Sequence, residues 1–432
     1  MGVDVAVFDE ICPNPTTEQV QAALLMAEEV GADCLVSVGG GSTHDVAKAV
    51  RALFGNKQQS EVHQLEGVDE LAENPILVHF AVSTTSGSSA ELTRLAVIND
   101  PLRHEKFSIV DERLTPTVTC DDTLLLLSQP PGLVSASGML ALSHAMEAFL
   151  SAASSPVTDA AALHAIRLIH TYLRRAAQSP PSDEEEFLKA HEMLTYAEFL
   201  SGLAFNSAGL GLTHAICNQM TAAHPKVNIS ECTSVMFPHV LQYYGEQNLE
   251  ENLEEEEPGK QKKNDVAELF VDLAAALGCP APATSSAAAA VPAVVRSVAR
   301  LAADLKLPET LQELNARCAG AEMRLDAIPE VASKALTDPG GMTAPCHPTL
   351  GEVESLICRA WDSGLTGAIP PEAHSLDEMA RAAHNTEDKG TPHPPVKELS
   401  WSVRYNRVGK GSQYVDFNDD AAAMIEEEEL IE

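Results

Sequence analysis

The hydrophobic positions follow two different periodicities along the chain, and the change falls near residue 129. Before it, short apolar runs end at turn residues. Residues 33–38 lead into three glycines, and residues 76–82 lead into a loop of small hydroxyl side chains. Such runs are typical of buried strands, whereas residues 43–54 between them repeat with helical spacing. Strands alternating with helices predict an α/β domain over residues 1–129.

Later segments complete this division. Residues 95–98 and 107–110 are expected to form a strand pair joined by a turn. After Pro130-Pro131 the spacing becomes helical, with Leu163, Ile166, Ile169 and Leu173 on one helix face. The pattern predicts an all-α domain over residues 130–365. A cleft between the two domains is the expected place for a ligand.

The composition and charge of the chain limit the classes of partner that it can bind. Hydrophobic residues make up 45% of the chain, which is ordinary, but the formal net charge is −35. An acidic surface repels phosphate backbones and anionic headgroups, so we expect neither nucleic acid nor a membrane as a partner. Nine cysteines without a CxxC pair, and no evident apolar run of membrane-spanning length, predict a reduced cytoplasmic protein.

Two segments depart from the globular pattern. Residues 250–265 have almost no apolar side chains and contain Pro258-Gly259, which predicts a solvated acidic insertion between helices. Residues 366–432 are polar and proline-containing and lead to an acidic end, which predicts a mostly disordered tail.

A glycine cluster, Gly39-Gly40-Gly41-Ser42, lies between an expected strand and an expected helix. Backbone N–H groups and a helix N-terminus can face a phosphate there, and glycine lets a diphosphate approach the main chain closely. The alternative is a tight strand-to-helix turn, and the cluster alone does not separate the two.

A second polar loop favours the nucleotide site. Thr84, Thr85 and Ser88 follow the next expected strand, so they should emerge at the same edge of a parallel sheet. Their hydroxyls can bond phosphate or ribose oxygens. Two polar loops at neighbouring strand ends therefore predict a nucleotide-binding edge.

Both loops resemble motifs of the iron-containing alcohol dehydrogenases. Residues 39–48 are similar to GGGSxxDxAK, and residues 84–93 are similar to TTxGTGSExT. Further similar segments occur in the family's order: Asn14-Pro15-Thr16, Lys106-Phe107, residues 138–147, residues 202–218, Pro238-His239-Val240 and residues 350–361. The resemblance spans residues 3 to about 363. It implies a Rossmann-like dinucleotide-binding domain followed by an all-α domain, the dehydroquinate synthase-like fold.

The resemblance also implies NAD or NADP as the cofactor. Gly39, Gly40, Gly41 and Ser42 would hold the diphosphate. Thr84, Thr85, Thr93 and Lys106 would surround the nicotinamide half, with Asp45 nearby and Ser88 contributing to the polar second loop. Ser89 and Ala90 depart from the family's Gly and Ser, which narrows the loop but keeps it polar.

The metal site implied by the resemblance is incomplete. The family's pattern is an Asp and a His four residues apart on one helix, plus two later histidines. His144 and His214 match ligands, and they are the expected metal and catalytic residues. Leu140 occupies the place of the Asp. Without that carboxylate, we expect a divalent metal, Fe or Zn, to be bound weakly or not at all.

The later part of this site differs as well. Asn218 occupies the place of another active-site histidine, and Asn228-Ile229-Ser230 stands at the last ligand. Replacement ligands would come from His224, Glu231 or Cys232, with Cys232 favouring zinc. Taken without the resemblance, His144 and His214 are more typical of core histidines on apolar helices.

The family's first strand and helix have no counterpart in this sequence, because residues 3–9 resemble its second strand. A doubly wound sheet without its central strand would have an open slot. The family's residue that chooses NAD over NADP belongs to the same region. Either the true start lies upstream of Met1, where any organelle-targeting segment would also lie, or the chain is a divergent form with impaired folding. The first is the simpler expectation.

Three functions follow from these patterns. The first is an NAD(P)-dependent alcohol dehydrogenase that moves hydride between a small alcohol or aldehyde and the nicotinamide, with a homodimer expected from base rates. The second is a catalytically silent NAD(P)-binding protein that acts as a scaffold or regulator. The third is a lyase or sugar-phosphate enzyme of the same architecture. The third needs basic cleft residues, and apart from histidines residues 138–147 and 202–230 offer only Lys226.

Overall fold

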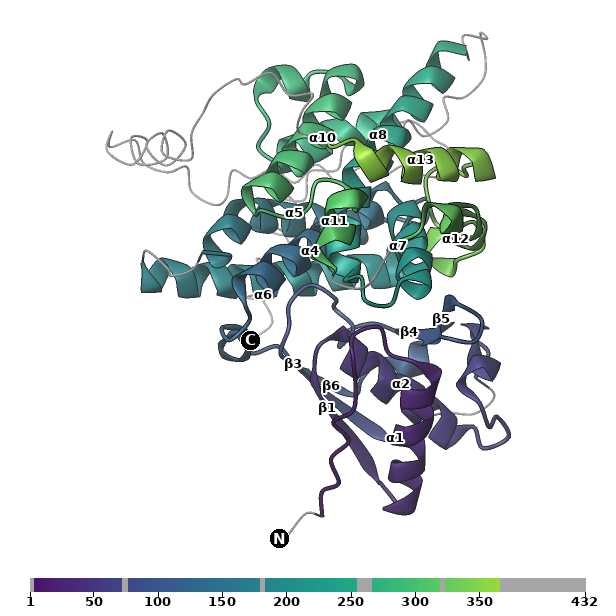
Figure 1. The fold of residues 1–432 in the computed structure, drawn as a ribbon. Coiled ribbons are helices and arrows are strands. Elements are labelled where there is room, and N and C mark those ends of the chain that lie inside the picture. Colours follow the sequence, from purple (N-terminus) through teal and green to yellow (C-terminus); the bar gives the residue numbers. More distant parts are fainter. Residues whose placement is uncertain (1–3, 72–76, 179–182, 255–265, 319–322, 366–432) are drawn as a thin grey trace, which may run out of the picture. The chain divides into compact units, whose positions relative to one another are not determined.

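The computed structural model describes residues 4–71, 77–178, 183–254, 266–318 and 323–365, without the side chains of 248–254. These residues belong to one compact unit, Met1–Thr366. Strands and helices alternate in its first part, and the described chain after β6 is helical (Figure 1). The expected α/β and all-α regions are therefore both present. The expected tail, residues 366–432, lies outside the described residues.

A three-stranded parallel sheet carries the two polar loops. Its order is β1 (Cys34–Gly39), β3 (Val78–Ser83) and β6 (Val118–Cys120). Gly39 pairs with Ser83, so β1 and β3 end at the same level. Helix α2 (Gly41–Gly55) follows β1 directly and buries an apolar face. The strands and helix expected from the pattern are confirmed, with boundaries shifted by one or two residues.

A second sheet lies beside the first. Its order is β2 (Gly67–Val68), β5 (Glu105–Val110) and β4 (Leu95–Asp100). Strands β4 and β5 are antiparallel and joined by a short turn, which confirms the expected strand pair. Helix α1 (Thr17–Glu29) begins at a capping box, in which the Thr16 side chain and Gln19 satisfy each other's backbone N–H groups. It packs against α2.

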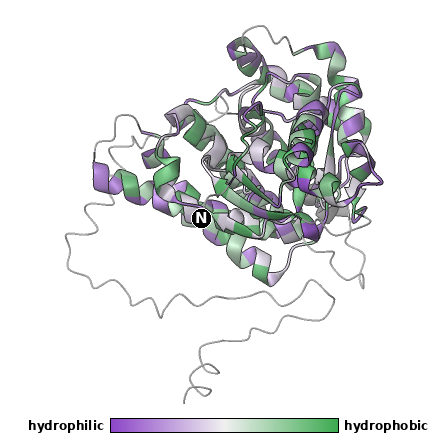
Figure 2. Ribbon diagram, turned by 90° about the horizontal axis from the view of Figure 1, so that it is seen from below, coloured by the Kyte–Doolittle hydropathy of each residue, from purple (hydrophilic) through white to green (hydrophobic). Residues whose placement is uncertain are grey.

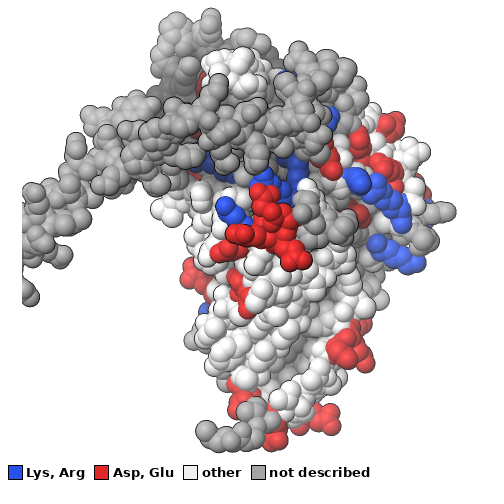
Figure 3. Space-filling view, turned by 90° about the vertical axis from the view of Figure 1, so that its left-hand side faces the viewer, with Lys and Arg blue, Asp and Glu red and all other residues white. Residues whose placement is uncertain are grey.

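One face of the β1-β3-β6 sheet is uncovered. Val36 and Val38 are each 59% exposed, and Val78, Phe80 and Val118 on the neighbouring strands are 38–49% exposed. Within the described part of the chain, β1 pairs only with β3, so its other edge is open. The α/β part of the surface in Figure 3 accordingly carries few charged side chains. The open slot expected beside β1 is thus a feature of the described structure.

The helical region is organised around α4 (Pro131–Leu150), which begins with proline at its first position and is buried from Val134 to Leu150. By length and composition α4 could cross a membrane, which corrects our expectation that no such run exists. However, 94% of its apolar window is buried inside the protein, as in a core helix. Figure 2 shows hydrophobic colour along the strands and alternating colour along the helices.

The other helices pack around this centre. The expected face on α5 is confirmed, because Ile166, Ile169 and Leu173 are fully buried. Helix α8 extends to Glu254, into the segment expected to be an insertion, and residues 255–265 lie outside the described residues. The remaining helical elements are η1 (Val62–Leu65), η2 (Glu112–Leu114), α3 (Thr123–Leu126), α5 (Pro156–Ala176), α6 (Glu184–Ala208), α7 (Leu212–Ala223), α8 (Ile229–Glu254), α9 (Val266–Ala276), η3 (Ala281–Thr284), α10 (Ala287–Asp304), α11 (Leu311–Arg317), η4 (Leu325–Ala327), α12 (Ile328–Ala335), η5 (Pro339–Gly341) and α13 (Leu350–Asp362).

Candidate functional site

The glycine loop and the hydroxyl loop are in direct contact. The backbone N–H of Thr84 donates to the carbonyl of Gly39 at 2.9 Å. A Cβ atom on Gly40 would lie 2.3 Å from Oγ1 of Thr85, and one on Gly41 would lie 2.9 Å from Oγ of Ser88. Only glycine fits at such distances. The structure therefore brings together the two loops that the strand ends predicted.

The start of α2 is suited to an anion. Gly40 is its N-cap and has no side chain to satisfy the first backbone N–H groups. The first turn, which includes Ser42, carries no acidic residue. Free N–H groups and the positive end of the helix dipole attract phosphate oxygens. Together with the glycine cradle, these features fit the diphosphate of a dinucleotide.

Beneath this loop, Lys48 joins two of the predicted nicotinamide-side residues. Its Nζ donates to the carbonyl of Leu95 at 2.7 Å and to Oγ1 of Thr93 at 3.1 Å, and lies 3.9 Å from Asp45. Burial lowers the pKa of Lys48 to about 8 and raises the pKa of Asp45 to about 6. This buried cation was not among the predicted site residues, although it ends the first motif. It ties α2 to β4 under the site.

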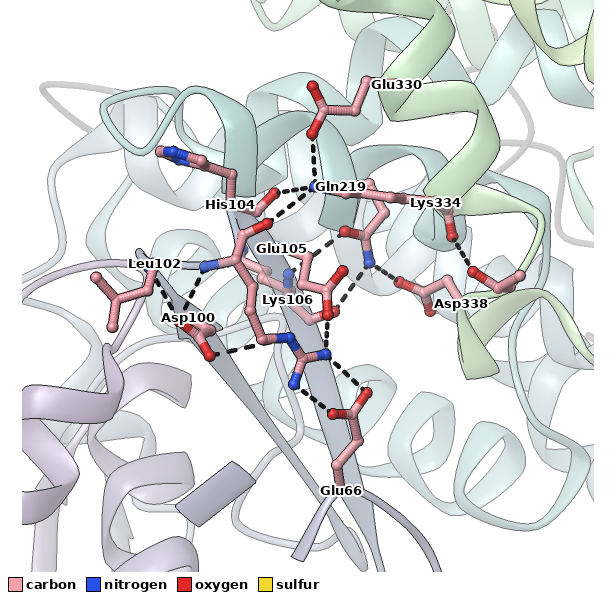
Figure 4. Close-up of polar contacts among 12 residues, drawn as sticks. Glu66, Asp100, Leu102, His104, Glu105, Lys106, Gln219, Glu330, Lys334 and Asp338 are labelled. Carbon is pink, nitrogen blue, oxygen red and sulfur yellow. Dashed lines mark hydrogen bonds and ion pairs between the residues drawn. The ribbon is translucent and has the colours of Figure 1, made fainter. Parts of the chain in front are cut away.

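Lys106, also predicted beside the nicotinamide, connects the two regions of the protein. Its Nζ donates to Oδ1 of Asn14 at 2.7 Å and to Oγ1 of Thr221 on α7 at 2.8 Å. Its carbonyl accepts from Gln219, which also donates to Asp338 at 2.7 Å (Figure 4). Burial lowers the pKa of Lys106 to about 8. The side chain thus has partners in both regions.

A second connection lies at the turn between β4 and β5. Lys334 on α12 donates to the backbone carbonyls of Arg103 and His104 at 3.0 and 2.9 Å (Figure 4). The Arg103 guanidinium pairs in turn with Glu66 and Glu105. The β4–β5 hairpin is therefore fixed to the helical region at its turn as well as at Lys106.

The predicted ligands His144 and His214 lie against each other. His144 comes from α4 and His214 from α7, and their rings stack with centroids 4.5 Å apart and 21° between the planes. The ring of Phe205 lies 4.4 Å from that of His144. His144 also has a backbone hydrogen bond with Gly87, which places it beside the hydroxyl loop. Burial lowers the pKa of His144 well below its ordinary value.

Glu147 orients His214. The Nδ1 atom of His214 donates to this carboxylate, which also accepts from the backbone N–H groups of Gly211 at 3.1 Å and Thr213 at 2.9 Å. A proton on Nδ1 leaves Nε2 of His214 as an acceptor, and this atom has no partner in the structure. Nδ1 of His144 also has none. From the sequence, Glu147 is expected to close a structural hydrogen bond or ion pair at the domain junction. The structure has these contacts, but they join α4 to the start of α7 and orient a predicted ligand.

The residues expected to replace the missing ligands do not join the two histidines. His224 lines an apolar pocket with Met220 and Met323, and the thiol of Cys232 contacts the sulfur of Met220 at 3.5 Å. Glu231 lies in the first turn of α8. Across the described parts of the chain, no three His, Cys, Asp or Glu side chains are arranged to hold a metal ion.

A small polar pocket is lined in part by the hydroxyl loop. Thr85, Gly87 and Ser89 line it, together with the carboxyl groups of Glu91, Asp121 and Glu198. Burial raises the pKa of Glu91 to about 7 and that of Glu198 well above its ordinary value. Only Glu91 belongs to a recognised motif. No sequence pattern places Asp121 and Glu198 there, because the end of β6 and the interior of α6 bring them in from distant parts of the chain.

Comparisons with known proteins agree with this architecture. Residues 1–123 match the family model described as iron-containing alcohol dehydrogenase, and residues 134–361 match the C-terminal model of the Fe-containing alcohol dehydrogenase family. The crystal structure of a 1,3-propanediol oxidoreductase has the same fold, with a TM-score of 0.71 and 32% identity over 83% of this chain and 85% of that one.

Sequence relatives lead to the same family. The 1,3-propanediol dehydrogenase of Citrobacter freundii is 34% identical over 360 residues, which are 83% of this chain and 84% of that protein. The NAD-dependent methanol dehydrogenase of Bacillus methanolicus is 40% identical over 242 residues, which are 56% of this chain and 61% of that protein. With both regions matched in order, this chain belongs to the iron-containing alcohol dehydrogenase family.

Proposed function

We propose that this protein binds a nicotinamide dinucleotide and transfers hydride between it and a small alcohol or aldehyde. The observation that carries the proposal is the contact between the glycine loop and the hydroxyl loop, which builds a phosphate cradle at the start of α2. The relative from Bacillus methanolicus is named NAD-dependent, which favours NAD over NADP for this chain. The names of the relatives favour a short-chain alcohol as the substrate.

The roles follow from position. The glycine loop and Ser42 hold the diphosphate, and the hydroxyls of Thr84 and Thr85 bond the cofactor beyond it. The nicotinamide carries the hydride chemistry, and the protein's part is to bind and orient the two reactants. In the oxidation direction the alcohol hydroxyl must release a proton. Nε2 of His214, whose other nitrogen is held by Glu147, is an acceptor for a hydrogen bond from that hydroxyl.

Two measurements test the proposal. Titration of the purified protein with NADH and NADPH, followed by nucleotide fluorescence, should give saturable binding that is stronger for NADH. Turnover should then be assayed with methanol, ethanol and 1,3-propanediol as donors. A folded protein that binds neither nucleotide would refute the proposal.

The same geometry supports a second candidate, a silent dinucleotide-binding protein. It is favoured by the observation that the described residues hold no third metal ligand beside His144 and His214. The two candidates share the binding result and differ in turnover. NADH production from any alcohol, abolished in a His214→Ala variant, would exclude the silent protein. Binding without turnover across the panel would select it.

A further inference from the structure

We infer that this protein holds no divalent ion between α4 and α7, and that the missing carboxylate at Leu140 is the reason. A stack of Phe205, His144 and His214 occupies the site instead. The inference rests on the proposed function only for placing the substrate beside this stack. It concerns ion binding and is independent of whether the dinucleotide binds.

The donor set is the first argument. A divalent ion in a protein needs three or four ligands, and a carboxylate supplies the charge that two imidazoles lack. Leu140, one helical turn before His144, offers an apolar side chain that is 7% exposed. A dication next to that surface would lose hydration without gaining a counter-charge.

Neighbouring carboxylates are already engaged. Glu147 accepts hydrogen bonds from His214 and from two backbone N–H groups. Asp338 is buried, with one oxygen accepting from Gln219 at 2.7 Å and the other from the backbone N–H of Gly340 at 2.8 Å. These hydrogen bonds direct both carboxylates toward other partners, and neither is grouped with the two histidines as a third ligand among the described residues.

The ring geometry is the second argument. Two imidazoles on one ion direct their in-plane lone pairs at a common point about 2 Å from each nitrogen. Rings that stack with only 21° between their planes keep their lone pairs in two separate, nearly parallel planes, which do not meet at such a point. The Gly87 backbone contacts His144 and Glu147 orients His214 in this arrangement. Without a carboxylate at position 140 to complete a site, both histidines rest as a stack rather than as a chelating pair.

The consequence for catalysis is specific. Any hydride transfer by this protein would proceed with the hydroxyl oxygen facing hydrogen-bonding groups rather than a metal ion, and chelators would leave its rate unchanged. The site would also disfavour substrates that carry a second, negatively charged group, because no metal ion is there to bind that group.

The test compares three proteins after loading with Zn²⁺ or Fe²⁺ under anaerobic conditions and exhaustive dialysis. We expect the full-length wild type to retain less than about a tenth of an ion per chain by elemental analysis. Leu140→Asp should retain at least tenfold more Zn²⁺, because it adds a carboxylate one turn from His144. Leu140→Asn, similar in shape but uncharged, is the matched control and should stay empty.

Two results would overturn the inference. One is about one retained ion per wild-type chain that is lost in His144→Ala. The other is a folded Leu140→Asp variant that stays as empty as Leu140→Asn, which would show that the missing carboxylate is not the cause. NADH titration of the same samples keeps the proposed function separate. Loss of nucleotide binding would refute that function and leave the ion measurements standing.

Discussion

The two ends of the candidate site, the cofactor end and the histidine end, use different kinds of chemical groups. At the cofactor end, the contacts come from backbone groups, a helix N-terminus and glycines that let the hydroxyl loop approach closely. At the histidine end, they come from individual side chains on α4 and α7. A backbone-built site survives most substitutions, because each residue brings the same N–H group. A side-chain site depends on each residue, and we propose that the leucine at position 140 has cost this one its metal.

The largest expected effect tests the cofactor end. Gly40→Val would place a Cβ atom 2.3 Å from Oγ1 of Thr85 and force the two loops apart. We expect NADH affinity to fall by roughly 100-fold or more, about 3 kcal/mol of binding free energy. Gly132→Val is the matched control, since a Cβ there meets nothing within 4 Å. Equal NADH affinities in the two variants would show that the contact between the two loops does not contribute to cofactor binding.

The next effect tests the histidine end. Glu147→Ala removes the acceptor for His214, Gly211 and Thr213, all of them buried. The free energy of unfolding should fall by about 2 to 3 kcal/mol, because three donors lose their partner. Glu147→Gln keeps an acceptor oxygen and should lose less. NADH affinity should change little in either variant, and a large parallel loss would mean that the two ends are not independent.

A pH-dependent effect of similar size tests Lys106, which links the α/β region to the helical region. The pKa of Lys106 is about 8 in the folded protein and 10.5 in an unfolded chain. Between those values the unfolded chain holds more protons, so stability rises with pH in that window. Relative to Lys106→Met, the unfolding free energy of the wild type should rise by about 2 to 3 kcal/mol from pH 8 to 10.5. Using the difference cancels the titration of other groups, and a flat difference would contradict the buried, depressed lysine.

The smallest effect tests how tolerant the cofactor end is. Ser89 has a φ of 51° and donates to the carbonyl of Glu198 at 2.9 Å. Ser89→Gly relieves the left-handed backbone and removes one hydrogen bond, two changes of about 1 kcal/mol with opposite sign. NADH affinity should stay within about threefold of the wild type. A larger change would show that this loop depends on side chains after all.

The sequence was most informative where local pattern determines structure. The strand runs at residues 33–38 and 76–82 predicted parallel strands, and parallel strands necessarily bring their following loops together. Leu140 at the place of the family's Asp was visible only through the resemblance to the family motif, whose i, i+4 spacing puts both positions on one helix face.

Long-range contacts were the part that could not be predicted. The bonds of Lys106 to Asn14 and Thr221 join residues 92 and 115 positions apart. Asp338 reaches Gln219 from a short turn that carries no motif. Likewise, the sequence named Cys232 as a replacement ligand, but the helix phase of α8 directs its thiol to Met220. Such pairings depend on how helices pack, which a one-dimensional pattern does not contain.

The uncovered valines on β1 have a consequence for how the protein behaves in concentrated solution. In residues 1–432 taken by themselves, without a strand supplied from upstream, an open strand edge beside an apolar face is a template on which a second molecule can add a strand. With a formal charge of −35, mutual repulsion keeps such molecules apart at neutral pH and low salt. Acidification neutralises the carboxylates and salt screens them, so both should bring on self-association. The negative charge thus acts as a colloidal stabiliser, and buffer choice would decide whether these molecules stay dispersed.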